Sequence, residues 1–167
     1  MRFWDVNQGA ITIDEEDIKQ IPTKHLRDME SYVTQETHLL HDSIASSIAI
    51  AKPKATRVEI MGAAKKASIH DFIMTLPNGY DTEVGELGDT LSGGEKQRIG
   101  IARAFLHDAQ MILMDEPTSN LDSLNEGIIL KSLKESSEEK TIVLVSHRIS
   151  TMNIADTVYE MKDGRIS

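Results

Sequence analysis

Two stretches of the sequence contain residue types suited to phosphate chemistry. One, LSGGEKQR, spans residues 91–98, and the other, MILMDE, spans residues 111–116. In the first, two glycines leave backbone N–H groups open to a ligand, and the N–H groups at the start of a helix favour an anion. The second ends in Asp115 and Glu116, which can hold Mg²⁺ through water and polarise a water molecule for attack on a phosphate. Their order and spacing predict a phosphate-handling site.

A helix is expected to position the first stretch. Ser92 and Glu95 have the S-x-x-E spacing of a capping box, so the helix should begin at Ser92. Ile99, Ala102 and Leu106 then recur at helical spacing. Alone, the Ser-Gly-Gly sequence would also fit an ordinary capped helix with a flexible first turn. The apolar stretch that follows, ending in Asp-Glu, favours the phosphate interpretation.

Strands are expected to position the carboxylates. The apolar run at residues 111–114 suits a central parallel strand covered on both faces, and its carboxyl end lies where open α/β sheets bind ligands. A second buried strand is expected at residues 141–145, directly before Ser-His-Arg. A histidine at a strand end is often structural. His147, however, should lie beside the strand that carries Asp115 and Glu116, where its imidazole could hold a phosphate.

The rest of the chain is expected to alternate between short elements and loops. A second capping box, Thr56 and Glu59, lies in a helical block at residues 42–76, with Val58, Met61 and Ala64 behind it. Strands are also expected at 10–13, 32–34 and 157–161, and the end of a helix at 1–5. An acidic turn is expected at 14–17, a loop at 80–90 and a tight turn at 163–164. A helix should run from Ser123 to about Glu135, with Leu124, Ile128 and Leu133 facing inward.

Composition limits the function classes. The 167 residues, 40% apolar and 27% charged, indicate one soluble globular domain. No apolar run has the length of a membrane span, and the N-terminus lacks the apolar region of a signal peptide. The absence of cysteine excludes disulfides and cysteine-based metal sites and fits a reducing cytosol. The net charge of −9 argues against nucleic-acid binding and against a polybasic membrane anchor, so membrane association should come from a partner.

With these residues in view, the sequence resembles the nucleotide-binding domain of an ABC transporter over nearly its whole length. The resemblance implies that Asp115 holds Mg²⁺, that Glu116 is the catalytic base and that His147 is the switch histidine. It implies that Gln35 contacts Mg²⁺ or the attacking water, and that Asp122, in the D-loop, takes part in ATP binding. It also identifies the signature motif, which clasps ATP held by the opposite subunit, with Leu91, Ser92, Gly93, Gly94 and Glu95.

The resemblance implies an α/β fold with a P-loop NTPase-like (RecA-like) parallel sheet core and an inserted α-helical subdomain. The expected division is 1–37 for the N-terminal part of the catalytic core, 38–90 for the helical subdomain and X-loop, 91–110 for the signature motif and its helix, and 111–167 for the catalytic core with Walker B, D-loop and H-loop. No G-x-x-x-x-G-K-[ST] sequence occurs in the chain, so the core should be incomplete at its N-terminus, without the Walker A region. We interpret the chain as an internal fragment of a longer protein and expect it to be inactive in isolation.

The implied activity is that of an ABC exporter, which couples hydrolysis of ATP with Mg²⁺ to transmembrane transport. The implied partners are a second nucleotide-binding domain, in a homodimer or heterodimer, and transmembrane domains contacted through Gln35 and the Thr82–Glu86 loop on the cytoplasmic side of the plasma membrane. The alternatives are a soluble ABC-type ATPase and a truncated, non-catalytic module that donates its signature motif in trans. The sequence departs from the usual family pattern at Leu87, Glu95 and Asn120.

Overall fold

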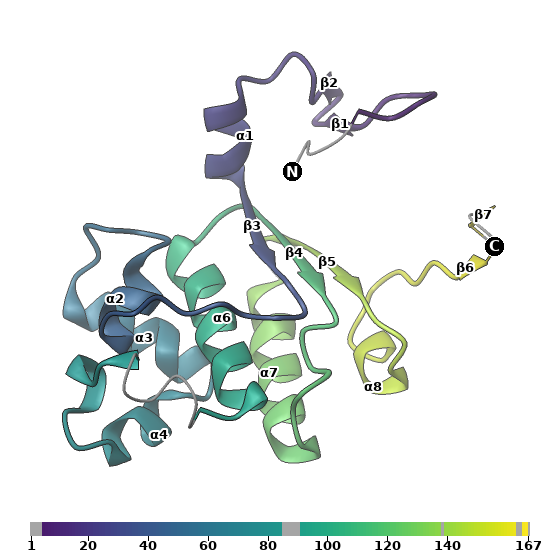
Figure 1. The fold of residues 1–167 in the computed structure, drawn as a ribbon. Helices are drawn as coiled ribbons and strands as arrows, with labels where there is room; N and C mark the ends of the chain where they lie inside the picture. Colours follow the sequence, from purple (N-terminus) through teal and green to yellow (C-terminus); the bar gives the residue numbers. More distant parts are fainter. Residues whose placement is uncertain (1–4, 85–90, 138, 163–164, 167) are drawn as a thin grey trace.

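The fold is built around a three-stranded parallel sheet with helices packed against it (Figure 1). The structure is a computed structural model and describes residues 5–84, 91–137, 139–162 and 165–166. The strands are β3 (Glu30–Val33), β4 (Met111–Asp115) and β5 (Thr141–Val145), in the order β3-β4-β5. The prediction of a central parallel strand at residues 111–114 is confirmed.

The helices follow from the need for crossover connections between parallel strands. Helix α6 (Gly93–His107) precedes β4, and α7 (Ser123–Ser136) connects β4 to β5. The register pairs Met114 with Val33 on one side and with Leu144 on the other. Buried side chains of α6 and α7 form one core with Val33, Ile112 and Met114 of the sheet. This layer fixes the positions of the strand ends.

Within the described residues, helices cover one face of the sheet, so the predicted cover on both faces is not found there. Ile112 and Met114 face the helices and are buried, whereas Tyr32 and Val143, on the other face, are 42% and 46% exposed. Val145 follows Val143 on that face and is 58% exposed. The strand at residues 141–145 is present, but the expectation that it is buried is wrong. An apolar run indicates a strand that can be covered on both faces, but it does not supply the second layer.

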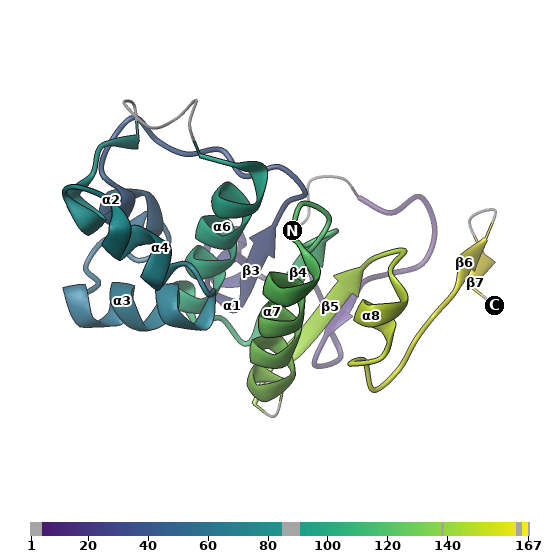
Figure 2. The same cartoon turned by 90° about the horizontal axis from the view of Figure 1, so that it is seen from below.

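A helical block lies beside the sheet, as predicted for residues 42–76 (Figure 2). It consists of α2 (Ile44–Ala49), α3 (Arg57–Lys66) and α4 (His70–Thr75), followed by the short helix η1 (Gly79–Asp81). The predicted capping box of Thr56 and Glu59 is present at the start of α3. Val58 is exposed rather than packed, because the buried face of α3 carries Ile60, Ala63 and Ala64.

The buried face of α7 differs from the expected one. Leu133 is buried as expected, but Leu124 and Ile128 are exposed, at 75% and 39%. Leu124 lies in the first turn and Ile128 points to solvent, because the face that meets the sheet carries other side chains, namely Glu126, Ile129, Leu130 and Leu133. The first buried residue of α7 is the polar Glu126, which interrupts the apolar pattern of the buried face. A prediction made from Leu124 and Ile128 therefore indicates the wrong face.

The peripheral elements are short. At the N-terminal end lie β1 (Thr12–Ile13), β2 (Glu16–Asp17) and α1 (Thr23–Met29). Of the acidic turn predicted at 14–17, only residues 14–15 form the turn. Residues 16–17 form β2, which pairs antiparallel with β1. After α8 (Ile149–Met152), the strand expected at 157–161 is instead β6 (Met161–Lys162), which pairs with β7 (Arg165–Ile166). Residues 1–4, 85–90 and 163–164 lie outside the described residues, and with them the expected helix end, Leu87 and the tight turn.

Candidate functional site

The predicted capping box positions the first group of candidate residues. The Ser92 hydroxyl oxygen accepts the N–H of Glu95 at 3.3 Å, and the N–H of Ser92 donates to Oε2 of Glu95 at 2.7 Å. Helix α6 therefore begins directly after Ser92, as predicted. This reciprocal cap holds the first turn of α6 in a fixed orientation while leaving its glycine-rich face without side chains.

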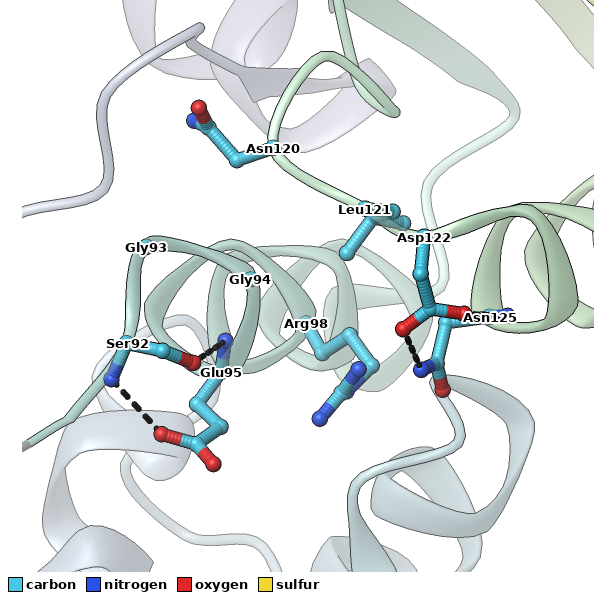
Figure 3. A pocket seen from close by; sticks show the side chains of 9 residues that line it. All are labelled: Ser92, Gly93, Gly94, Glu95, Arg98, Asn120, Leu121, Asp122 and Asn125. Carbon is cyan, nitrogen blue, oxygen red and sulfur yellow. Dashed lines mark hydrogen bonds between the residues drawn. The ribbon is translucent and has the colours of Figure 1, made fainter.

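The start of α6 forms an open pocket with the loop that leads into α7 (Figure 3). The two segments approach closely: a Cβ atom on Gly94 would lie 2.9 Å from the backbone oxygen of Asn120. The packing of the loop thus requires glycine at this position. The pocket has a volume of about 480 Å³ and is lined by Ser92, Gly93, Gly94, Glu95, Arg98, Asn120, Leu121, Asp122 and Asn125. The predicted residue Leu91 is buried directly before the helix.

Asp122 lies in this pocket as the N-cap of α7. Its Oδ1 accepts the N–H groups of Leu124 and Asn125, each at 3.0 Å. These hydrogen bonds, first that of the Asn125 N–H, lower the pKa of the Asp122 carboxyl group. Burial lowers the pKa of Arg98, while the neighbouring Glu95 and Asp122 raise it. The pocket thus presents one half-buried guanidinium between two carboxylates, beside the open N–H groups of a helix start.

The second group of candidate residues lies at the carboxyl ends of β4 and β5. Nδ1 of His147 is 2.7 Å from Oε1 of Glu116. Oε2 of Glu116 is buried and has no hydrogen-bond partner among the described residues. The prediction that His147 lies beside the strand bearing Glu116 is confirmed. Unpaired buried carboxylate oxygens are rare in folded proteins and call for an explanation.

Glu116 has an unusual backbone conformation. Its φ is +48°, in the left-handed region that costs an L-residue roughly 1–2 kcal/mol. Its N–H donates to the carbonyl of Val145 at 2.9 Å, so the chain turns away while still attached to the neighbouring strand. Glu116 thus lies outside the regular alternation of β4, which ends at Asp115.

Gln35 and Asp115 lie at the carboxyl ends of neighbouring strands, β3 and β4. Asp115 is the last residue of β4, opposite in direction to the buried Met114 and hence toward the open face of the sheet. Gln35 is exposed, two residues after the end of β3. The part of the chain that the structure describes contains no cluster of three or more His, Cys, Asp or Glu side chains suited to a metal.

Sequence reasoning missed a partly buried ion pair that joins α7 to the segment between β5 and α8. Oε2 of Glu126 accepts Nη1 of Arg148 at 2.8 Å, and Nη2 of Arg148 donates to the carbonyl of Ser119 at 3.2 Å. Oε1 of Glu126 accepts the hydroxyl groups of Ser150 and Thr118, at 2.7 and 3.3 Å. A glutamate on the same helix face as Ile129, Leu130 and Leu133 was the signal that could have revealed it.

Helix α6 also holds the segment that follows β3. Nε of Arg103 donates to the carbonyl of Ser47 at 2.6 Å, and its Nη1 donates to the carbonyl of His38 at 2.8 Å. A Cβ on Gly100 would lie only 2.4 Å from Oγ1 of Thr37. The segment carrying Gln35 is therefore packed against the same helix whose first turn lines the pocket.

A family described as ABC transporter matches residues 1–119 of the chain. The chain belongs to the ABC transporter family. The resemblance seen in the sequence is thereby confirmed, together with the α/β fold of a P-loop NTPase-like core. In the described part of this ABC chain, no helix is both long and apolar enough to cross a bilayer.

Relatives show what this ABC chain is similar to. It is 58% identical over 167 residues to a Haemophilus influenzae protein named "Probable ABC transporter ATP-binding/permease protein", covering 100% of the chain and 30% of that protein. It is 46% identical to the heavy metal tolerance protein of Schizosaccharomyces pombe, covering 99% of the chain and 20% of that protein. The chain thus spans less than a third of the length of the curated relatives it matches.

A solved structure supports the fold in detail. It is described as a bacterial Atm1-family ABC exporter with ATP bound, and it superposes on this ABC chain with a TM-score of 0.93 and 42% sequence identity. The match covers 99% of the chain and 29% of that structure's chain. The arrangement of the sheet, the helical block and helix α6 is therefore shared with an ABC exporter.

Proposed function

We propose that this chain is part of the ATP-hydrolysing domain of an ABC exporter, which couples hydrolysis to transport across a membrane. The observation that carries the proposal is the state of Glu116. One carboxylate oxygen is held by His147, and the other is buried and unpaired among the described residues. A carboxylate oxygen can accept two hydrogen bonds, so Oε1 can accept one from a water molecule in addition to that of His147. Glu116 is then the general base of the reaction.

His147 has two functions in this proposal. An ionised carboxylate can only accept hydrogen bonds, so Nδ1 of His147 donates to Glu116. Nε2 is then an acceptor in the neutral ring and a donor in the imidazolium ion. A ring that donates through both nitrogens would contact a phosphate oxygen through Nε2 while it orients Glu116 through Nδ1. Its side chain is 79% exposed, which leaves Nε2 accessible to a ligand.

The chain offers oxygen ligands for Mg²⁺ at the ends of two neighbouring strands. Asp115 ends β4, and Gln35 follows β3. These oxygen donors fit Mg²⁺, which takes one or two protein ligands and keeps several waters. When bound there, Mg²⁺ would neutralise charge on the phosphates. Asp115 and Gln35 would orient its water ligands from one edge of the sheet.

The pocket at the start of α6 is proposed to contact ATP held by a second ABC nucleotide-binding domain. Backbone N–H groups at Gly93 and Gly94 lie at a helix start, which favours an anion. The Ser92 hydroxyl accepts the N–H of Glu95 and keeps its own hydrogen for donation to a phosphate oxygen. Arg98 adds a positive charge in the same pocket.

Association with a membrane is proposed to occur through transmembrane domains on the cytoplasmic side of the plasma membrane. The curated relative from Haemophilus influenzae is named as an ATP-binding/permease protein. The proposed contacts are Gln35 and the Thr82–Glu86 loop, of which the structure describes residues 82–84. That part is fixed to the start of α2, because the N–H of Ile44 donates to the carbonyl of Thr82 at 3.1 Å and the N–H of Val84 to that of Asp42 at 2.9 Å.

The test uses a chimera in which this chain replaces its matching segment in the Haemophilus influenzae relative. The chimera is expected to hydrolyse ATP, and Glu116→Gln is expected to lower kcat by about 10²-fold or more while ATP binding persists. Glu135→Gln, on the exposed side of α7, is the matched control and should leave the rate unchanged. A Glu116→Gln chimera with the unaltered rate, or an assembled chimera that binds ATP without hydrolysing it, would contradict the proposal.

A further inference from the structure

A buried side-chain amide joins helix α6 to the loop that carries Glu116. Gln97 is 1% exposed, among the most buried side chains of the chain. Its Nε2 donates to the backbone carbonyl of Glu116 at 3.0 Å, and its Oε1 accepts the N–H of Asn120 at 3.2 Å. Both ends of the amide are therefore used, and both contact the same loop, four residues apart. A buried polar side chain with two such partners restricts the loop to one position.

The first of these contacts acts on a strained residue. Glu116 has a φ of +48°. Its carbonyl accepts Nε2 of Gln97 and, at 3.2 Å, the N–H of Ser119 in the following turn. A left-handed residue other than glycine persists only when its surroundings determine its conformation. Without the amide of Gln97, the Glu116 carbonyl keeps only the local turn contact, which does not connect the loop to α6.

We propose that Gln97 is a positioning residue for ATP hydrolysis, a conclusion that rests on the function proposed above. By holding the Glu116 carbonyl, it fixes the backbone that directs one carboxylate oxygen at His147 and leaves the other unpaired. By accepting the N–H of Asn120, it fixes the loop that packs on Gly94 at the start of α6. One amide thus sets the position of the general base relative to the pocket that faces the second nucleotide.

The test compares variants in the chimera. Gln97→Met conserves volume and removes both hydrogen bonds, whereas Gln97→Glu keeps an acceptor for Asn120 but cannot donate to the Glu116 carbonyl when ionised. Both are expected to lower kcat by about 10-fold or more, with KM for ATP changed by less than about 3-fold, because the base is misplaced and the nucleotide contacts remain. Leu106→Met, buried on the same helix, is the control and should keep kcat.

A second readout does not depend on activity. Hydrogen exchange of the Asn120 amide is expected to accelerate in Gln97→Met and to remain slow in Gln97→Glu and Leu106→Met. If Glu116→Gln lowers kcat but Gln97→Met keeps it within about 2-fold, only this inference is overturned. If Gln97→Met raises KM as much as it lowers kcat, or leaves Asn120 exchange unchanged, the residue is not a positioning residue. If Glu116→Gln keeps the unaltered rate, the proposed function fails and this inference with it.

Discussion

Nδ1 of His147 lies 2.7 Å from Oε1 of Glu116, across the carboxyl ends of two neighbouring parallel strands. The register explains the contact, because Asp115 pairs with Val145 and the residues that follow leave the sheet at the same edge. The left-handed turn at Glu116 then directs its carboxylate toward His147. The pair therefore depends on strand register and on one backbone angle, and both can be tested.

The first prediction concerns His147. In the chimera, His147→Ala is expected to lower kcat by about 10²-fold, because Glu116 loses its orienting donor and the phosphate loses a contact. Steady-state ATPase assays measure the effect, with His25→Ala on the exposed side of α1 as the control. A rate within about 3-fold of the unaltered chimera would mean that the imidazole has no role in hydrolysis.

The second prediction concerns the contact between Gly100 and Thr37. Alanine has the higher helix propensity by about 1 kcal/mol, but its Cβ would lie 2.4 Å from Oγ1 of Thr37. Overpacking of this kind costs about 1–3 kcal/mol, so Gly100→Ala is expected to destabilise the chain. Urea unfolding measures the change.

The matched double variant isolates the steric cause. Thr37→Ala removes the two side-chain atoms nearest to the added methyl group, so the Gly100→Ala/Thr37→Ala chain should recover most of the lost stability. Strictly additive effects of the two substitutions would show that the contact does not exist in solution.

The third prediction concerns the ion pair of Glu126 and Arg148, whose side chains are largely removed from solvent. Arg148→Met leaves the buried Glu126 carboxylate without its cation, and a loss of about 1–3 kcal/mol is expected. Glu126→Gln should cost less, because an amide oxygen still accepts a hydrogen bond. Urea midpoints of the two variants give the comparison, and an equal or reversed order would contradict the assignment.

The fourth prediction concerns acid stability. The pKa of Glu59 is lowered from its usual 4.5 to about 2, first by the hydrogen bond from Lys52 and then by the N–H of Thr56. Because the folded pKa is below the unfolded pKa, ionised Glu59 stabilises the fold above about pH 4.5, and this contribution is lost as the pH falls toward 2. Glu59→Gln should therefore show a smaller loss of stability over this range.

Urea midpoints measured from pH 5 downward provide the comparison, because glutamine at this position still serves a capping box. The carboxyl ¹³C shift of Glu59 should titrate near pH 2 in the unaltered chain. Identical pH dependence in the two chains, or titration of Glu59 near its usual value, would disprove the coupling to Lys52 and Thr56.

Local rules predicted much of this structure. The capping boxes at Ser92 and Thr56, the central strand and the proximity of Glu116 to His147 depend on short-range spacing and on the parallel register, which a sequence displays directly. The buried face of α7 was predicted only in part, because it includes Glu126, whose partner Arg148 is distant in sequence. The amide bridge of Gln97 was missed because its partners are backbone groups, which have no sequence signal.

The uncovered face of the sheet has a practical consequence for work with this chain. Tyr32, Val143 and Val145 place apolar surface in water beside strands whose outer edges carry no partner strand among the described residues. We expect such a surface to promote self-association through the strand edges during purification. Soluble yield should therefore rise when Val143 and Val145 are replaced by threonine, which retains β propensity and reduces the exposed apolar surface.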